Sequence, residues 1–175
     1  METFPLPSLS LDEAMELQFK LVEAVTNHFS GAEILTRGDL GVVKGLNQPK
    51  TTNKVEKVLA EFFEAEAAML VRGSGTNAIR LALHASVGTG KTLLVHDAPV
   101  YPTTQVSIDM LGIKLVYADF NDWVNVEAAL KENQIDGILI QVTRQKMADS
   151  YDLRTLITQI RSLDQKVKIL TDDNY

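Results

Sequence analysis

The chain has 175 residues, of which 45% are hydrophobic and 23% are charged, with a net charge of −6 and no cysteine. This is the composition of a globular domain with its own core, and its acidic balance gives no general attraction to nucleic acid or anionic membrane. Without cysteine, disulfides, thiolate metal sites and cysteine nucleophiles are excluded, and we expect no metal site. No apolar run approaches the roughly 20 residues that span a bilayer, and the N-terminus lacks a signal-peptide pattern, so we expect a cytoplasmic location.

The first third of the chain is predicted to hold two helices separated by a long loop. Ser10 and Glu13 have the spacing of a capping box, and the amphipathic helix that follows them is expected to fade near Phe29. From residue 30 to residue 50 the periodicity stops and glycines accumulate, which predicts a loop of about twenty residues. A loop of this length is more often functional or partner-bound than idle. Asn53 is the predicted N-cap of the second helix.

The rest of the sequence alternates apolar runs with amphipathic segments, which predicts strands alternating with helices. The predicted strands are Ala67–Val71, Thr92–His96, Lys114–Ala118, Gly137–Val142 and Val167–Thr171. The predicted helices are Asn77–Ser86, Thr104–Leu111, Val124–Asn133 and Leu153–Leu163. This alternation is typical of the α/β class, as a three-layer α/β/α domain whose mostly parallel sheet has helices on both faces. Ligands of such sheets bind beyond the carboxyl ends of the strands.

The stretch from Val71 to Ile79 is the strongest candidate for a binding site. An apolar run leads into Gly73-Ser74-Gly75-Thr76, where a helix is expected to begin. Glycines let the backbone turn tightly and approach a ligand, and a helix start presents free N–H groups and a positive dipole end. The stretch therefore predicts an anion site, with phosphate as the expected anion. A tight turn without a ligand is the simpler alternative.

Two nucleotide-binding motifs are also matched in part. Residues 85–92 fit a relaxed Walker A pattern, but they follow a helix and precede a strand, so we interpret them as an ordinary turn at the amino edge of the sheet. Gly73, Gly75 and Ala78 fit a dinucleotide fingerprint, and Asp97 lies where a ribose-binding acid would be. An NAD-dependent oxidoreductase is therefore an alternative, although about 65 residues precede the first predicted strand and a Rossmann domain usually starts close to its fingerprint.

Longer motifs resemble the large domain of fold-type I pyridoxal-phosphate enzymes, a group with aminotransferases and cystathionine lyases. These motifs are residues 35–41 (LTRGDLG), 45–49 (GLNQP), 94–104 (LVHDAPVYPTT) and 170–175 (LTDDNY), which closely resemble those of the aminotransferase-like bacterial YhfS proteins. The resemblance implies a pyridoxal 5'-phosphate cofactor, an amino-acid substrate and a homodimer with its active site near the subunit interface. Aminotransferase-like activity is the leading expectation, and a pyridoxal-phosphate-dependent carbon–sulfur lyase is an alternative.

The resemblance assigns cofactor contacts to two places in the first half of the sheet. Ser74, Gly75 and Thr76 resemble the turn that holds the cofactor phosphate through backbone N–H groups and a hydroxyl. Tyr101 resembles the aromatic residue that stacks on the pyridine ring, and a surface-loop tyrosine is its plainer interpretation.

Further contacts are assigned to the ends of the later strands. Asp172 resembles the acid that pairs with the protonated pyridine nitrogen, which keeps the ring able to absorb electrons. In the family, a tyrosine often follows this aspartate after two residues, and its hydroxyl reaches the phenolic oxygen of the cofactor. Tyr175 has this spacing from Asp172. Asp173 is the alternative for the acidic residue, but no tyrosine follows it at this spacing. Arg144 is a possible contact to substrate or cofactor, and a surface charge is an equal alternative.

The resemblance also implies parts that are missing from these 175 residues. The lysine that forms the Schiff base would follow Asp172, and no lysine here matches it. We therefore expect about the first half of an enzyme, inactive alone, without the small C-terminal domain. Residues 1–50 are an N-terminal helix and loop expected to face a second subunit, and residues 51–175 are a partial large domain of about five strands. In the family, two later strands lie between the first strand, here Ala67–Val71, and the fifth. Without them its backbone N–H and C=O groups would be unpaired, so the chain alone is not expected to be a stable monomer. A third hypothesis is a chain that keeps an anion site but catalyses no reaction.

Overall fold

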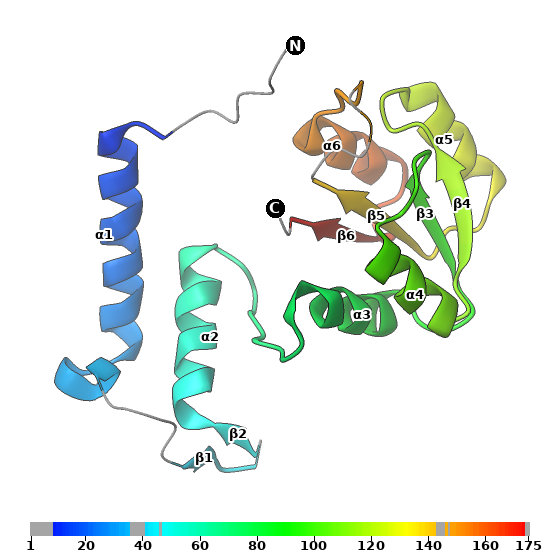
Figure 1. Ribbon diagram of the computed structural model, residues 1–175. Helices are drawn as coiled ribbons and strands as arrows, with labels where there is room; N and C mark the ends of the chain where they lie inside the picture. Colours follow the sequence, from blue (N-terminus) through cyan, green and yellow to red (C-terminus); the bar gives the residue numbers. More distant parts are fainter. Residues whose placement is uncertain (1–8, 36–40, 46, 143–145, 147, 174–175) are drawn as a thin grey trace. The chain divides into compact units, whose positions relative to one another are not determined.

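The computed structural model describes residues 9–35, 41–45, 47–142, 146 and 148–173 (Figure 1). The chain divides into two compact units, Met1–Leu70 and Val71–Tyr175. In the described part of the chain, no helix has both the length and the apolar character needed to cross a membrane.

The first unit is built on two helices, α1 (Leu11–His28) and α2 (Lys50–Phe62), which pack against each other. The capping box predicted for α1 is present, because the Ser10 hydroxyl accepts from the Glu13 amide and the Glu13 carboxylate accepts from the Ser10 amide at 2.8 Å. Ala24, Phe29 and Val58 form the small core between the helices.

The segment between α1 and α2 has more structure than the predicted loop. It contains the 3-10 helix η1 (Gly31–Leu35) and an antiparallel pair, β1 (Val42–Val43) and β2 (Gln48–Pro49), while residues 36–40 and 46 lie outside the described part. The prediction that Asn53 caps α2 is wrong, because α2 begins three residues earlier, after Pro49. Asn53 instead donates to the Gln48 side chain at 3.2 Å.

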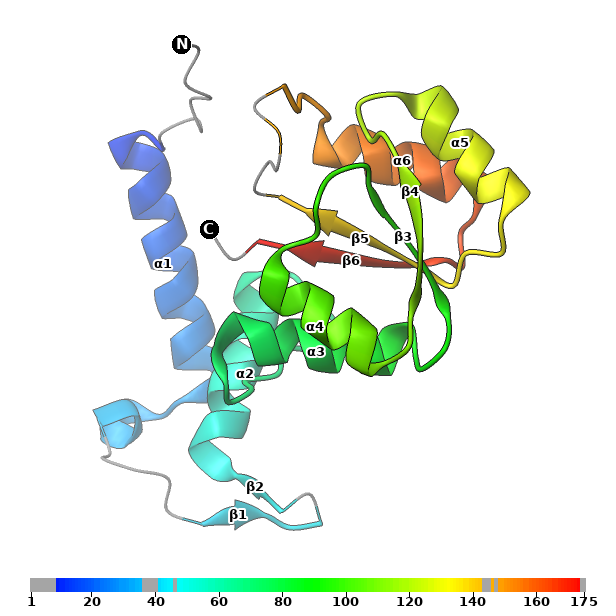
Figure 2. The ribbon, with the colours of Figure 1, turned by 45° about the vertical axis from the view of Figure 1, so that its right-hand side comes forward.

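The second unit is a three-layer α/β/α sandwich, as predicted (Figure 2). Four parallel strands form its sheet in the order β4-β3-β5-β6; they are β3 (Thr92–His96), β4 (Lys114–Ala118), β5 (Gly137–Gln141) and β6 (Lys168–Asp172). Two helices cover each face: α3 (Ser74–Ser86) and α4 (Pro102–Met110) lie on one, α5 (Trp123–Glu132) and α6 (Leu153–Leu163) on the other.

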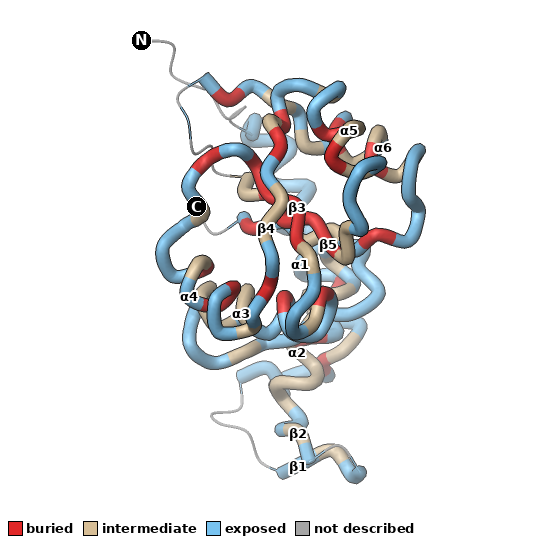
Figure 3. The backbone as a smooth tube through the Cα atoms, turned by 90° about the vertical axis from the view of Figure 1, so that its right-hand side faces the viewer, coloured by how far each residue is buried: buried red, intermediate tan, exposed pale blue. Residues whose placement is uncertain are grey.

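The core follows the alternation of side chains along the two inner strands, β3 and β5, which hold most of the buried residues of the sheet (Figure 3). Leu93 and Val95 belong to the cluster packed on α3 and α4, while Leu94 belongs to the cluster packed on α5 and α6. His96 has the same parity as Leu94, so its side chain faces α5 and α6.

The predicted strand Ala67–Val71 is wrong, since these residues form neither helix nor strand. Met69 is 78% exposed and Leu70 is 51% exposed, so the apolar character that suggested a buried strand is not used for burial. None of the described strands pairs with this segment, and a strand without a neighbour leaves its backbone N–H and C=O groups unpaired. The main sheet of the described chain therefore has four strands rather than five.

The predicted boundary between the two parts of the chain lay after residue 50. In the structure α2 packs against α1, so the boundary between the two units lies after Leu70. The expectation that residues 1–50 face a second subunit and that residues 51–175 belong to a cofactor-binding domain stays a prediction.

Candidate functional site

All four strands of the main sheet are parallel, so their carboxyl ends lie along one edge. The N-terminus of α3 lies at the same edge, because α3 ends at Ser86, shortly before β3 begins at the opposite edge. Figures 1 and 2 show α3 starting near the arrowhead of β6, and the two elements are in contact.

The predicted phosphate turn has an unusual backbone. Gly73 has a φ of +94° and Ser74 has a φ of +57°, both in the left-handed region, and α3 begins at Ser74 rather than at the predicted Asn77. A Cβ on Gly73 would lie 2.9 Å from the Asn77 Cβ, so only glycine fits there. The Asn77 side chain donates to the Arg72 carbonyl at 2.7 Å, and the Ser74 hydroxyl donates to the Gly73 carbonyl at 2.7 Å. Side-chain hydrogen bonds therefore hold this strained turn in place.

The first turn of α3 offers amides to a ligand. The first hydrogen bond of the helical pattern runs from the Asn77 amide to the Gly73 carbonyl at 3.3 Å. The amides of Ser74, Gly75 and Thr76 precede it and therefore have no helical acceptor. The Thr76 hydroxyl also donates to the Thr103 hydroxyl at 3.4 Å, which joins the first turns of α3 and α4.

Tyr101 and Asp172 lie at the same edge, at the ends of different strands. Tyr101 follows β3, forms the N-cap of α4 and is 46% exposed. Asp172 is the last residue of β6 and only 9% exposed, whereas Asp173 is exposed, which favours Asp172 as the fixed acid of this pair. β5 lies between β3 and β6. The predicted site residues Arg144 and Tyr175 lie outside the described residues.

The two nucleotide motifs lack the structure that their function needs. The Walker-like residues form the turn from α3 to β3 at the amino edge, as predicted, and Lys91 pairs with Asp136 at 3.3 Å. The dinucleotide fingerprint has no strand before Gly73 in the described chain. Asp97, its expected ribose-binding acid, pairs instead with Lys146, with 3.7 Å between the ammonium nitrogen and a carboxylate oxygen.

Asp97 and Lys146 line an open pocket beside the segment that leads to Tyr101. The full lining is Asp97, Ala98, Pro99, Val100, Gln105, Tyr117 and Lys146. The sequence did not single out Lys146 for this place, because no motif surrounds it.

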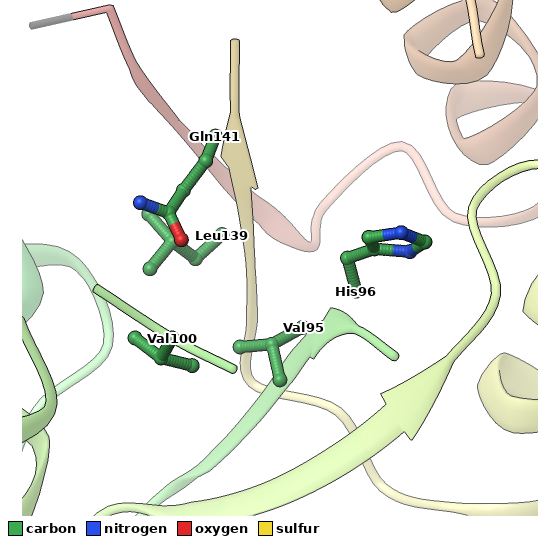
Figure 4. Close-up of a pocket in the computed structure, with 5 residues that line it drawn as sticks. All are labelled: Val95, His96, Val100, Leu139 and Gln141. Atoms are coloured by element: carbon green, nitrogen blue, oxygen red, sulfur yellow. The ribbon is translucent and has the colours of Figure 1, made fainter. Parts of the chain in front are cut away.

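A second, very small pocket is lined by Val95, His96, Val100, Leu139 and Gln141 (Figure 4). The figure shows the His96 ring turned away from Leu139 and Gln141. The ring is 5% exposed, and its Nε2 lies 2.9 Å from a carboxylate oxygen of Asp149, which is fully buried. Sequence analysis missed this pair because its members are 53 residues apart and match no motif.

The charge of Asp149 is compensated by hydrogen bonds. Burial alone would raise the pKa of Asp149, but hydrogen bonds from the Lys146 amide, the Asn121 side chain and His96 lower this pKa below its usual value. The carboxylate therefore stays ionised inside the protein. Among the described residues, no three acidic or histidine side chains gather as metal ligands.

Comparison with known proteins matches nearly the whole chain. The model of the family "Aminotransferase class I and II" matches residues 16–170. Uncharacterized protein YhfS of Escherichia coli strain K12 is 51% identical over all 175 residues, which are 48% of its length.

Solved structures agree with this match. The crystal structure of the pyridoxal-5'-phosphate dependent protein YhfS from Escherichia coli has a TM-score of 0.92 at 50% identity, over 99% of this chain and 47% of that one. A carbon-sulfur lyase involved in aluminum resistance from Clostridium novyi NT has a TM-score of 0.74 at 22% identity, over 93% of this chain and 43% of that one, and shares the fold. The chain thus spans about half the length of these relatives, and it belongs to the class I and II aminotransferase family.

Proposed function

We propose that the protein is a pyridoxal-phosphate-dependent enzyme that acts on an amino acid, with aminotransferase-like activity. The observation that carries this proposal is the set of groups at one sheet edge: a helix start whose first amides have no helical acceptor, an exposed tyrosine and a buried aspartate. The family membership and the pyridoxal-phosphate dependence of the relative from Escherichia coli support it.

The residues present match the chemistry of each part of the cofactor. The amides of Gly75 and Thr76, with the Thr76 hydroxyl, would hold the phosphate at the positive end of α3. Tyr101 offers an aromatic face, and Asp172 offers a carboxylate to a protonated pyridine nitrogen. When bound, the cofactor supplies an electron sink for a carbanion formed on the substrate.

Asp172 has the central role in this proposal. Asp172 is largely buried, so water screens the charge of its carboxylate only weakly. The carboxylate therefore attracts a cationic ring more strongly than it would at the surface. Its backbone is fixed as well, because the Asp172 carbonyl accepts from the Val142 amide at 2.8 Å and extends the pairing of β5 with β6. Asp172 would therefore hold the proton of the pyridine nitrogen in one place.

We assign the lysine linked to the cofactor to a position outside these 175 residues, so the chain alone is expected to be inactive. Lys91, Lys114 and Lys168 lie at the starts of strands, at the edge opposite the proposed site. Lys146 lies at the correct edge but pairs with Asp97. A homodimer, a cytoplasmic location and an amino-acid substrate belong to the same proposal.

The test uses the protein encoded by the complete reading frame, purified with added pyridoxal 5'-phosphate. We expect a visible absorption band from bound cofactor, and transfer of an amino group from a panel of amino acids to a 2-oxo acid. A protein that binds no cofactor would refute the proposal. Release of ammonia and a thiol from a sulfur-containing amino acid, without amino transfer, would replace the aminotransferase part with a carbon–sulfur lyase.

A further inference from the structure

The pair of His96 and Asp149 lies at the edge that carries the proposed site, yet the proposed function gives it no task. His96 is the last residue of β3, five positions before Tyr101. Burying a carboxylate against an imidazole costs desolvation energy, and apolar side chains of similar volume often stabilise a core at least as well. The pair therefore calls for an explanation other than stability.

The hydrogen bonds define the state of the ring. The Phe120 amide donates to Nδ1 of His96 at 3.0 Å, so Nδ1 is an acceptor and carries no proton. Nε2 consequently bears the proton of the neutral ring and donates it to Asp149 at 2.9 Å. Phe120 and Tyr151 also pack on the ring, with centroid distances of 5.3 and 5.5 Å. The ring is held by contacts on several sides, so it has one orientation.

Asp149 belongs to the connection between β5 and α6 and organises the part of it that the structure describes. Its carboxylate accepts from the Lys146 amide at 2.8 Å and from the Asn121 side chain at 3.1 Å. The Asn121 side-chain oxygen in turn accepts from the amides of Ser150 and Tyr151 at 2.6 and 3.1 Å. Residues 146 and 149–151 are thus fastened to the end of β3 and to the turn after β4.

The hydrogen bonds of Asp149 also fix a residue that lines the open pocket beside the segment leading to Tyr101. The Lys146 amide is fixed by Asp149, and the Lys146 ammonium lies 3.7 Å from Asp97, the residue that follows His96. Asp97 and Lys146 face the pocket together with Pro99 and Val100, which lead to Tyr101. A shift of Asp149 would therefore move a cation in the pocket beside the segment that leads to Tyr101.

We propose that His96 is a positioning residue of the cofactor and substrate site, a proposal that rests on the function proposed above. Through Asp149 it holds Lys146 and residues 149–151 at the carboxyl edge and so sets the place of Lys146 beside Asp97. A fully hydrogen-bonded buried network favours one arrangement over its competitors, which is the property that such a site needs.

Two substitutions separate this role from a general contribution to stability. His96→Gln keeps an N–H group long enough to reach Asp149 but removes the acceptor for the Phe120 amide. His96→Asn keeps an acceptor close to the Nδ1 position but is too short to reach Asp149. Both variants lose the ring and its packing, so both are expected to unfold at a lower urea concentration, and each is the control for the other.

The variants are made in the protein encoded by the complete reading frame. Hydrogen exchange of the Lys146, Ser150 and Tyr151 amides is measured without cofactor, and the dissociation constant of pyridoxal 5'-phosphate is measured by fluorescence titration. We expect His96→Asn to raise the exchange rates and the dissociation constant by about tenfold, and His96→Gln to stay near the unaltered protein in both.

Equal exchange rates and equal dissociation constants in the two variants would overturn the positioning role. An unaltered protein that does not bind pyridoxal 5'-phosphate would refute the proposed function instead, and the exchange rates would then decide by themselves whether His96 holds Lys146 and residues 149–151.

Discussion

Substituting Gly73 by alanine tests the geometry of the phosphate turn. At a φ of +94°, a residue other than glycine costs roughly 1–2 kcal/mol. The new Cβ would also lie 2.9 Å from the Asn77 Cβ, which belongs to the first turn of α3 and cannot rotate away. Such overpacking costs roughly 1–3 kcal/mol more, so Gly73→Ala should lower the free energy of unfolding by roughly 2–5 kcal/mol.

The matched control is Gly90→Ala. Gly90 also has a positive φ, +72°, but nothing lies within 4 Å of a Cβ added there, and the residue lies in the turn before β3 at the opposite edge. This variant should lose only the roughly 1–2 kcal/mol of backbone strain and should bind pyridoxal 5'-phosphate as well as the unaltered protein.

Gly73→Ala should also weaken cofactor binding by about tenfold or more, because relief of the clash moves the amides of Ser74, Gly75 and Thr76. Urea unfolding without cofactor measures the stability change, and fluorescence titration with pyridoxal 5'-phosphate measures the affinity. If the Gly73 and Gly90 variants had the same cofactor affinity, the turn at Gly73 would not be the phosphate site.

Three further substitutions test other parts of the account in the same protein. Asp172→Asn should still bind the cofactor but lose activity by roughly 100-fold or more in a steady-state assay, because the pyridine nitrogen is no longer held protonated; full activity would exclude the assigned role. Gly137→Ala would place a Cβ 2.7 Å from Val87 and should cost roughly 1–3 kcal/mol in urea unfolding without changing cofactor affinity, since Gly137 starts β5 at the opposite edge. The lowered pKa of Asp149 contributes stability above the unfolded-state pKa of about 3.9, and this contribution is lost as the pH falls through the lower folded-state value. Asp149→Asn should therefore destabilise the protein at pH 7, and the difference in the free energy of unfolding should narrow below about pH 4; a constant difference would contradict this.

The strands and helices of the second unit were predictable because their local signals agree with their surroundings. Four of the five predicted strands exist, each within a residue of its predicted bounds at either end, and Leu153–Leu163 is a helix as predicted. The apolar run Ala67–Val71 misled because a strand depends on a neighbouring strand, which local sequence does not reveal. α3 begins earlier than predicted because its first hydrogen bond runs from the Asn77 amide to the Gly73 carbonyl. The turn that permits this bond has a positive φ at Ser74, which is uncommon for serine and which the local sequence does not reveal.

The candidate site was predictable where it follows chain order and not where it depends on distant contacts. Ser74, Tyr101 and Asp172 come at or near the ends of apolar runs or at a helix start, and parallel topology brings such positions to one edge. The pairing of His96 with Asp149 was not predictable, because it joins residues 53 positions apart that match no motif.

The most direct test of the central claim is a crystal structure of the protein encoded by the complete reading frame, with pyridoxal 5'-phosphate bound. The account predicts the cofactor phosphate at about 3 Å from the amides of Gly75 or Thr76, with Tyr101 against the pyridine ring and the Asp172 carboxylate at its nitrogen. A cofactor bound away from the start of α3, or a ring that reaches Tyr101 but not Asp172, would contradict it.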